Sequence, residues 1–237
     1  MTSRARRQGR VDGERRSASK HPAGGCPWID GLCPVSITEP GRRWIKRVLD
    51  IVFAASGLIA LAPVMVVIAC SVKITMGSPV FYRQLRPGFH GEPFELVKFR
   101  TMRGEYDSHG RRIPQEERPT RLGYWLRKTS LDEVPELWAI LKGDMSLVGP
   151  RPLLVEYLPR YTPEQARRHD VKPGLTGLAQ VMGRHTISWD DRFTYDIYYV
   201  DHWSLRLDAR IILRTLRVMT AGDGRRPANY FEGSDHS

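Results

Sequence analysis

Residues 51–72 read IVFAASGLIALAPVMVVIACSV, a run of 22 residues without a charge. At about 1.5 Å per residue, a straight helix of this length spans the roughly 30 Å hydrocarbon layer of a bilayer. A helix buried in a soluble protein is the alternative, but the length of the run favours a membrane segment. The run therefore separates this chain from ordinary soluble enzymes.

The residues in and around this run leave its path through a membrane open. Pro63 lies inside it, where proline removes a backbone hydrogen bond and clashes with the preceding turn. A helix broken there would enter and leave on the same face, whereas a kinked helix would still span the bilayer. A spanning helix should also have one flank depleted in Lys and Arg. Here basic residues stand on both sides: Arg42, Arg43, Lys46 and Arg47 before the run, and Lys73, Arg83 and Arg86 after it.

The net charge of +11 indicates an anionic partner, which could be nucleic acid, a lipid surface or a phosphorylated substrate. Residues 1–47 hold 11 basic and 4 acidic residues, or +7, and we interpret them as a lipid-facing flank and tail on the cytoplasmic side. Residues 1–40 are rich in Arg, Gly, Ser and Pro and are predicted to form a disordered basic tail. Three cysteines exclude a disulfide scaffold.

The rest of the chain predicts an α+β, mainly helical domain over residues 76–222 and a flexible C-terminal tail over 223–237. Two β-prone runs, 80–85 and 94–100, flank the turn residues ArgProGlyPheHisGly. This pattern predicts a β-hairpin with a medium loop.

Several helix ends follow from capping signals. Apolar residues recur at helical spacing from Val134, and Gly143 stands where a C-terminal cap belongs. ThrProGluGln at 162–165 predicts a capping box with a first-turn proline. Ser188, followed by Asp191, predicts the start of another helix.

Residues 203–219 predict a basic amphipathic helix. Apolar residues recur at spacings of 4, 3, 4 and 3, with arginines on the opposite face. Such a helix can lie in the membrane interface, or it can pack on the domain core with a solvated charged face, and the two interpretations are equally supported. The apolar set is Leu205, Ala209, Ile212, Leu216 and Met219, and the basic set is Arg206, Arg210, Arg214 and Arg217.

The segment ArgLysThrSerLeuAspGlu (127–133) is the first candidate site. Ser130 and Glu133 fit a capping box, so the two acids have a structural explanation as the start of a helix. However, the adjacent carboxylates Asp132 and Glu133 also follow two basic residues, and this mixture suits phosphate and metal together. A helix N-terminus would add N–H groups for an anion, with Pro135 constraining the turn.

Two other segments supply cations. Arg151 stands between prolines in GlyProArgPro (149–152), which predicts a preorganised guanidinium for a phosphate or a carbonyl; an ordinary rigid turn is the alternative. Lys98 begins LysPheArgThrMet at the end of a predicted strand. Together these segments predict a basic, carboxylate-containing site suited to phosphoryl chemistry at the bilayer surface.

The sequence resembles the bacterial sugar transferases, the monotopic polyprenyl-phosphate phosphoglycosyl transferases that begin cell-surface glycan assembly. The resemblance runs from about Lys46 to Met219. It rests on these ordered blocks: LysArgValLeuAsp (46–50), SerProValPheTyrArgGln (78–84), LysPheArgThrMet (98–102), ArgLysThrSerLeuAspGluValProGluLeu (127–137), GlyAspMetSerLeuValGlyProArgPro (143–152), LysProGlyLeuThrGly (172–177) and TyrValAspHisTrpSerLeu (199–205).

The resemblance implies transfer of a sugar-1-phosphate from a UDP-sugar to a polyprenyl phosphate, usually undecaprenyl phosphate, with release of UMP. It also implies Mg²⁺ and a covalent phospho-aspartate intermediate. Such enzymes initiate exopolysaccharide, capsule, O-antigen or glycoprotein glycan assembly, with downstream glycosyltransferases as further partners. The expected location is the bacterial cytoplasmic (inner) membrane, with the catalytic domain on the cytoplasmic face. Because no large membrane domain precedes the anchor, the chain is expected to resemble the small members.

The resemblance also implies residue roles. Asp132 attacks the sugar-bearing phosphate, and Glu133 supports catalysis, the two carboxylates together holding Mg²⁺. The implied substrate-binding residues are Lys98, Arg127, Arg151 and Pro152. The family's broken re-entrant helix matches Pro63 and favours insertion from one face over residues 41–75.

The chain departs from the family pattern at three positions. Ala62 replaces a frequent Ser before the membrane proline, which bears on the sharpness of the bend. Leu178 and Met182 replace a common Trp and Asn, which bears on the donor or on local packing.

Two other functional classes stand as alternatives. A non-catalytic scaffold of a glycan pathway is disfavoured by the intact Asp132, Glu133 and Arg151. A membrane-tethered nucleic-acid-binding protein is disfavoured because no recognised nucleic-acid motif accompanies the Arg-rich tail, so nucleic acid is not expected as a partner.

Overall fold

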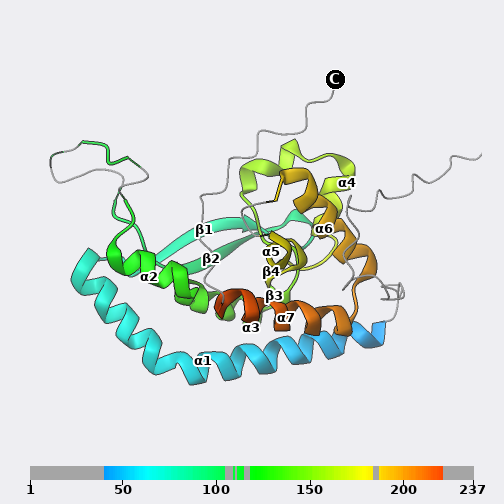
Figure 1. Cartoon of the computed structure of the whole chain (residues 1–237), viewed down its shortest axis with the longest axis horizontal. Helices are drawn as coiled ribbons and strands as arrows, with labels where there is room; N and C mark the ends of the chain where they lie inside the picture. Colours follow the sequence, from blue (N-terminus) through cyan, green and yellow to red (C-terminus); the bar gives the residue numbers. More distant parts are fainter. Residues whose placement is uncertain (1–39, 105–108, 110, 115–117, 184–186, 221–237) are drawn as a thin grey trace, which may run out of the picture.

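A computed structural model describes residues 40–104, 109, 111–114, 118–183 and 187–220. Of the predicted tails, over residues 1–40 and 223–237, all but Pro40 lie outside this part of the chain, and Pro40 is the first residue of a helix. One long helix forms an edge of the molecule, and the other elements pack along one side of it (Figure 1). The architecture is α+β and mainly helical, as predicted.

Helix α1 (Pro40–Met76) contains the whole apolar run. Its 37 residues correspond to about 55 Å of helix, well beyond the thickness of the hydrocarbon layer. Pro63 lies inside it, and the helix visibly changes direction along its length (Figure 1). Among the described residues, this is the one helix long and apolar enough to cross a membrane, and only 11% of its most apolar window is buried.

The predicted hairpin is confirmed. Strand β1 (Phe81–Pro87) pairs antiparallel with β2 (Pro93–Phe99), and a short 3₁₀ turn, η1 (Phe89–Gly91), lies in the loop. Because side chains alternate along a strand, Phe94 and Leu96 of β2 face the core and Lys98 lies on the same face at the strand end.

The remaining elements are short and mostly helical. Two three-residue strands, β3 and β4, form a small parallel pair. In chain order the elements are α2 (Arg121–Thr129), η2 (Leu131–Glu136), α3 (Leu137–Lys142), β3 (Ser146–Val148), η3 (Val155–Arg160), α4 (Pro163–Ala166), η4 (Arg167–His169), β4 (Gly174–Thr176), α5 (Leu178–Gly183), α6 (Trp189–His202) and α7 (Leu205–Thr220).

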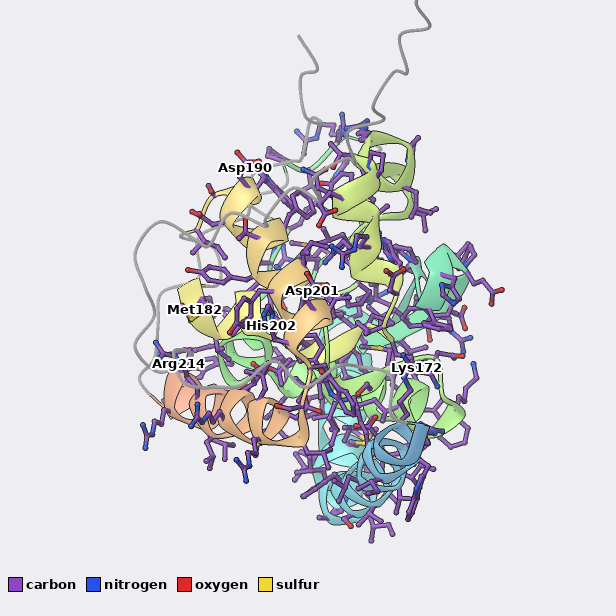
Figure 2. All side chains as sticks on the ribbon, turned by 90° about the vertical axis from the view of Figure 1, so that its right-hand side faces the viewer. Lys172, Met182, Asp190, Asp201, His202 and Arg214 are labelled. Carbon is purple, nitrogen blue, oxygen red and sulfur yellow. The ribbon has the colours of Figure 1, made fainter. Side chains whose placement is uncertain are left out.

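Helix α6 connects the two ends of the domain. Figure 2 shows Asp190 at the end opposite α1, while Asp201 and His202 lie closer to α7 and α1. Its buried face, with Tyr199 and Val200 among its residues, packs against α5 and α7. Leu178, one of the departures from the family pattern, is 1% exposed in this core, so it acts in packing.

Most predicted caps are confirmed. Gly143 ends α3 with φ of 102°, a left-handed conformation that glycine adopts without strain. Thr162 and Gln165 form the predicted reciprocal capping box of α4. The Ser188 hydroxyl accepts from the Asp191 N–H at the start of α6.

The predicted capping box at Ser130 is wrong. Ser130 has φ of 59° and makes no side-chain cap, because it is the left-handed residue that ends α2. Asp132 and Glu133 therefore lie in a 3₁₀ turn rather than in the first turn of an α-helix. The Glu133 side chain is thus available for contacts outside its own element.

The predicted apolar face of α7 is confirmed only in part, since Leu205 and Ile212 are half-buried against the core but Leu216 is exposed. The buried residues are Leu207, Asp208 and Ile211, whereas Leu213 and Leu216 are 60% and 57% exposed. The helix begins at Leu205, since Trp203 belongs to the end of α6. Helix α7 thus packs one face on the domain and leaves a second apolar strip outside.

The basic flank before the apolar run does not simply face lipid. Lys46 Nζ donates to Asp208 Oδ2 at 2.7 Å and to the Val148 carbonyl at 3.1 Å. Asp208 also accepts from the Tyr199 hydroxyl and the Trp203 indole. This buried hub fastens α1 to α7 and β3 and corrects the lipid-facing interpretation for Lys46.

Two neighbouring residues of α1 add to this attachment. Arg47 donates to the carbonyls of Ile140 and Leu141, at 2.5 and 2.7 Å, and so satisfies the C-terminal end of α3. Asp50, 4% exposed, accepts the N–H of Leu147 at 3.0 Å. The first turns of α1 are therefore an integral part of the catalytic domain's packing.

Candidate active site

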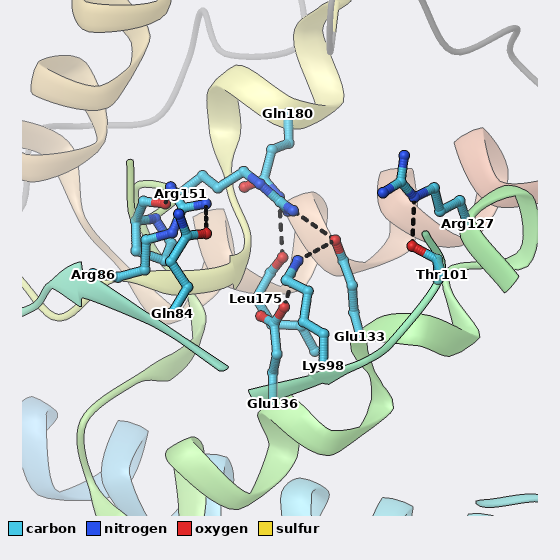
Figure 3. A network of polar contacts seen from close by, with 11 residues as sticks. Gln84, Arg86, Lys98, Thr101, Arg127, Glu133, Glu136, Arg151, Leu175 and Gln180 are labelled. Atoms are coloured by element: carbon cyan, nitrogen blue, oxygen red, sulfur yellow. Dashed lines mark hydrogen bonds and ion pairs between the residues drawn. The ribbon is translucent and has the colours of Figure 1, made fainter. Parts of the chain in front are cut away.

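Three predicted segments meet at one place. Lys98 comes from the end of β2, Glu133 from η2 and Arg151 from the loop after β3 (Figure 3). They meet because η2 packs across the inner face of β2, beside the buried Val134 and Leu137. The 3₁₀ turn then directs Glu133 toward the strand and the loop.

Glu133 is the centre of the charged group. Its Oε1 accepts from Lys98 Nζ at 3.0 Å and from Arg151 Nη2 at 2.5 Å. Lys98 Nζ also lies 2.7 Å from Glu136 Oε1, so one ammonium bridges two carboxylates. Charge-assisted contacts of this length are strong and fix geometry.

The surroundings shift the pKa values of Glu133 and Glu136 in opposite directions. Burial alone would raise the pKa of Glu133, but Arg151 and Lys98 outweigh it and hold that pKa well below the usual range. Burial raises the pKa of Glu136, which Lys98 offsets only in part. Glu133 raises the pKa of Arg151 against the effect of burial. The site therefore keeps an ionised carboxylate between two cations.

Asp132 lies beside this group and is 6% exposed. Its charge contributes to the raised pKa of Arg151, after those of Glu133 and Glu136. A carboxylate removed from water in the neighbourhood of a guanidinium has lost much of its hydration. This arrangement suits attack on a phosphate.

Arg127 is not brought into the same group. Its Nε donates to Thr101 Oγ1 at 2.9 Å, and Figure 3 shows it to one side of Glu133 and Arg151. Pro152 is buried, and its carbonyl accepts from Arg86 Nη1 at 3.5 Å, so its observed contact is with the protein.

The structure adds residues that sequence reasoning missed. Arg86, at the end of β1, donates to Gln84 Oε1 at 2.7 Å, and burial and Arg151 lower its pKa. Gln180 of α5 directs its side chain toward the charged group in Figure 3 and donates to the Leu175 carbonyl at 3.0 Å. In the sequence, Arg86 stands out as a flanking charge of the apolar run and as the first residue of the hairpin turn, and Gln180 sits in no local charge pattern. Glu136, three positions after Glu133, could have been inferred from helical spacing.

The loop carrying Arg151 depends on close backbone contact. A Cβ on Gly149 would lie 2.4 Å from the Lys172 carbonyl oxygen and 2.9 Å from the Gly174 nitrogen. Only glycine allows β3 and β4 to approach this closely at the start of the loop. The turn is therefore more than an ordinary surface turn.

A buried carboxylate near a cluster of two cations and two glutamates, on a domain packed against a long apolar helix, is the kind of arrangement expected of a membrane-associated phosphoryl-transfer protein. The chain belongs to the bacterial sugar transferase family, which matches residues 41–222.

Three relatives illustrate the similarity. The chain is 49% identical over 186 residues to the uncharacterized sugar transferase EpsL of Bacillus subtilis, covering 78% of this chain and 92% of that protein. It is 41% identical to the UDP-glucose:undecaprenyl-phosphate glucose-1-phosphate transferase of Caulobacter vibrioides, covering 75% and 70%. It is 36% identical to the undecaprenyl-phosphate galactose phosphotransferase of Salmonella typhimurium, covering 80% of this chain but only 43% of that protein.

Proposed function

We propose that this chain transfers a sugar-1-phosphate from a UDP-sugar to undecaprenyl phosphate and releases UMP. The observation that carries the proposal is the buried Asp132 beside Glu133, Lys98 and Arg151, on a domain fastened to a long apolar helix. The names of the Caulobacter and Salmonella relatives support this substrate pair. The product would be the first lipid-linked sugar of an exopolysaccharide or capsule, which downstream glycosyltransferases extend.

The proposed chemistry has two displacements. A carboxylate oxygen of Asp132 forms a bond to the sugar-bearing phosphorus, and the bond from that phosphorus to UMP breaks. An oxygen of the lipid phosphate then attacks the same phosphorus and releases the Asp132 carboxylate. Splitting the transfer lets a soluble donor and a lipid acceptor use one site in turn.

The surrounding cations have distinct tasks in this scheme. Arg151 and Lys98 would neutralise the phosphates, because attack by a carboxylate on a diphosphate otherwise meets repulsion between anions. Glu133 holds both cations in place, as its contacts at 2.5 and 3.0 Å indicate. Arg127 stands aside from this group, so we assign it to the nucleotide part of the donor.

Mg²⁺ fits the donor set as a proposal. Asp132 and Glu133 offer carboxylate oxygens, the ligand type that Mg²⁺ prefers, and this ion is commonly bound by one or two carboxylates together with substrate phosphates. When bound, Mg²⁺ would add positive charge at the reacting phosphate.

Release of UMP tests the function. Full-length protein in detergent, given undecaprenyl phosphate and Mg²⁺, should release UMP from at least one member of a panel of UDP-glucose, UDP-galactose and their N-acetyl forms. Without the lipid acceptor, release should stop near one UMP per chain, because the covalent intermediate cannot turn over. Absence of release from every donor would contradict the proposal.

We further propose that α1 is re-entrant, with Pro63 at its bend, and that α7 lies in the membrane interface. Large apolar side chains of α1 face outward, and α2 and α7 also expose apolar or aromatic residues, which suits contact with lipid. The exposed set includes Val52, Phe53, Ile59, Val66 and Ile74 of α1, Tyr124 and Trp125 of α2, and Leu213 and Leu216 of α7. The domain would then lie on the cytoplasmic face of the inner membrane.

Cysteine labelling checks this topology. In a chain whose native cysteines are replaced by Ala, Arg43→Cys and Arg83→Cys should both resist a membrane-impermeant maleimide in intact cells and both react in inverted vesicles. A helix entering and leaving on one face puts both ends in the same compartment. Opposite accessibility would show a spanning helix and refute re-entry.

A further inference from the structure

Behind the catalytic loop lies a buried ion pair that the proposed chemistry does not use. Arg168 of η4 and Asp196 of α6 are 2% and 1% exposed. Asp196 Oδ2 accepts from Arg168 Nε at 3.1 Å and from Nη2 at 2.7 Å. The same Nη2 donates to the backbone carbonyl of Arg151 at 2.8 Å. The pair therefore reaches the backbone of the residue whose side chain holds Glu133.

Stability alone is a weak reason for this arrangement. Desolvating two charges offsets much of their attraction. Well-packed apolar residues at a buried position often give a protein as much stability as an ion pair does. A guanidinium, however, presents five donors in a rigid fork and can satisfy a carboxylate and a carbonyl together. Arg168 also donates to the Tyr161 hydroxyl at 3.3 Å and packs near Phe193, so its orientation is fixed on several sides.

The loop is held at both ends of a short span. The Val148 carbonyl, before the loop, accepts from Lys46 Nζ and the Tyr199 hydroxyl. The Arg151 carbonyl accepts from Arg168. With the backbone fixed on both sides, the Arg151 side chain has one preferred approach to Glu133 at 2.5 Å. A site for phosphoryl transfer needs such fixed cations, because a small displacement of a cation from the reacting phosphate lowers the reaction rate strongly.

We infer that Arg168, oriented by Asp196, is a positioning residue that sets the Arg151 guanidinium in the phosphoryl-transfer site. This inference rests on the proposed function. Arg168 acts through the Arg151 carbonyl and has no part in the bond changes.

The test is Arg168→Lys. Lysine keeps the charge that Asp196 needs, but a single nitrogen on a flexible stem does not reproduce the fork that also holds the carbonyl. We expect kcat/KM for the UDP-sugar to fall about 10- to 100-fold and the affinity for UDP to fall as well, with a near-wild-type melting temperature. Asp196→Asn, which keeps the shape of the partner, should shift both readouts in the same direction and provides a second variant if Arg168→Lys folds poorly.

Arg167→Lys is the matched control. Arg167 is the neighbouring residue and pairs with Asp201 on the same helix α6, but it is partly exposed and contacts no residue of the catalytic group in the described structure. We expect its kcat/KM and UDP affinity to stay within about twofold of wild type, as for an exposed ion pair.

A double-mutant cycle separates positioning from general stability. If Arg168 acts through Arg151, adding Arg168→Lys to a chain that already carries Arg151→Lys should lower kcat/KM by a further factor of less than about two. A full additional loss, or wild-type kcat/KM and UDP affinity in Arg168→Lys alone, would overturn the inference. A wild-type chain that releases no UMP would instead refute the proposed function, while the UDP affinities would still decide the role of Arg168.

Discussion

Asp132→Asn should lower the rate of UMP release by at least about 10³-fold, the scale on which loss of a covalent nucleophile acts. A carboxamide cannot form the acyl-phosphate, yet it has nearly the same size as the carboxylate. Release of UMP by the purified chain in detergent measures the effect.

A second measurement distinguishes a lost nucleophile from a damaged site. With a donor labelled in the sugar phosphate and no lipid acceptor, wild-type protein should retain about one label per chain, and Asp132→Asn should retain none. Asp190→Asn, at an exposed position far from α1 in Figure 2, should behave like wild type. Turnover by Asp132→Asn at the wild-type rate would remove Asp132 from the nucleophile role.

Lys46→Met should lower the free energy of unfolding by about 3–5 kcal/mol, the usual effect of removing one partner of a buried ion pair. The side chains of Lys46 and Asp208 are only 19% and 9% exposed, and their contact of 2.7 Å joins α1 to α7. Without the ammonium, Asp208 keeps two neutral donors but no opposite charge. The melting temperature in detergent should fall by roughly 10 °C.

The pH dependence of this loss follows from Asp208. Burial raises the pKa of Asp208, and Lys46 lowers it, so removing Lys46 raises it further. Stability that comes from a raised folded-state pKa is present at low pH and lost as pH rises through that pKa. The stability difference between variant and wild type should therefore narrow at acidic pH.

Lys142→Met is the control, because it breaks the exposed pair with Asp144. It should lower the free energy of unfolding by less than about 1 kcal/mol. A loss as large as that of Lys46→Met would contradict the special role of Lys46.

Local signals predicted the elements that depend on local physics. The hairpin and the caps at Gly143, Thr162 and Ser188 are confirmed, because turn chemistry and capping involve residues a few positions apart. The Ser130 cap failed for a local reason too. The preceding helix needed a left-handed residue to end, and that conformation prevents Ser130 from capping the next turn.

Which residues of α7 and α1 are buried depends on long-range packing, which the local sequence pattern does not contain. Helix α7 has apolar residues on more than one face, and the spacing of 4, 3, 4 and 3 identified only part of the core face, because the buried positions are Leu207, the charged Asp208 and Ile211. Lys46, more than 160 positions earlier, supplies the opposite charge for Asp208, and Tyr199 and Trp203 donate to the same carboxylate. Long separations in sequence also hid the roles of Lys46 and Arg47, whose partners lie more than 90 positions later in the chain.

The candidate site divides in a similar way. Separate sequence motifs predict Asp132, Glu133 and Arg151 as site residues, and the structure brings Glu133 and Arg151 together with Lys98. Arg168 was not found, because its contact is with the backbone of Arg151 and leaves no chemical signature in the sequence. Residues that act on a site through main-chain atoms are visible only once the fold is known.

The attachment of α1 to the strand before the catalytic loop has a consequence for when a newly made chain becomes active. Lys46 and Asp50 hold Val148 and Leu147, so the loop of Arg151 is positioned partly by a helix that is long and apolar enough to enter a membrane. A newly made chain that has not yet inserted would lack a settled partner for that helix. The active site would then be completed only when the helix has inserted. Nucleotide sugars would meet an active enzyme only where the lipid acceptor is also present.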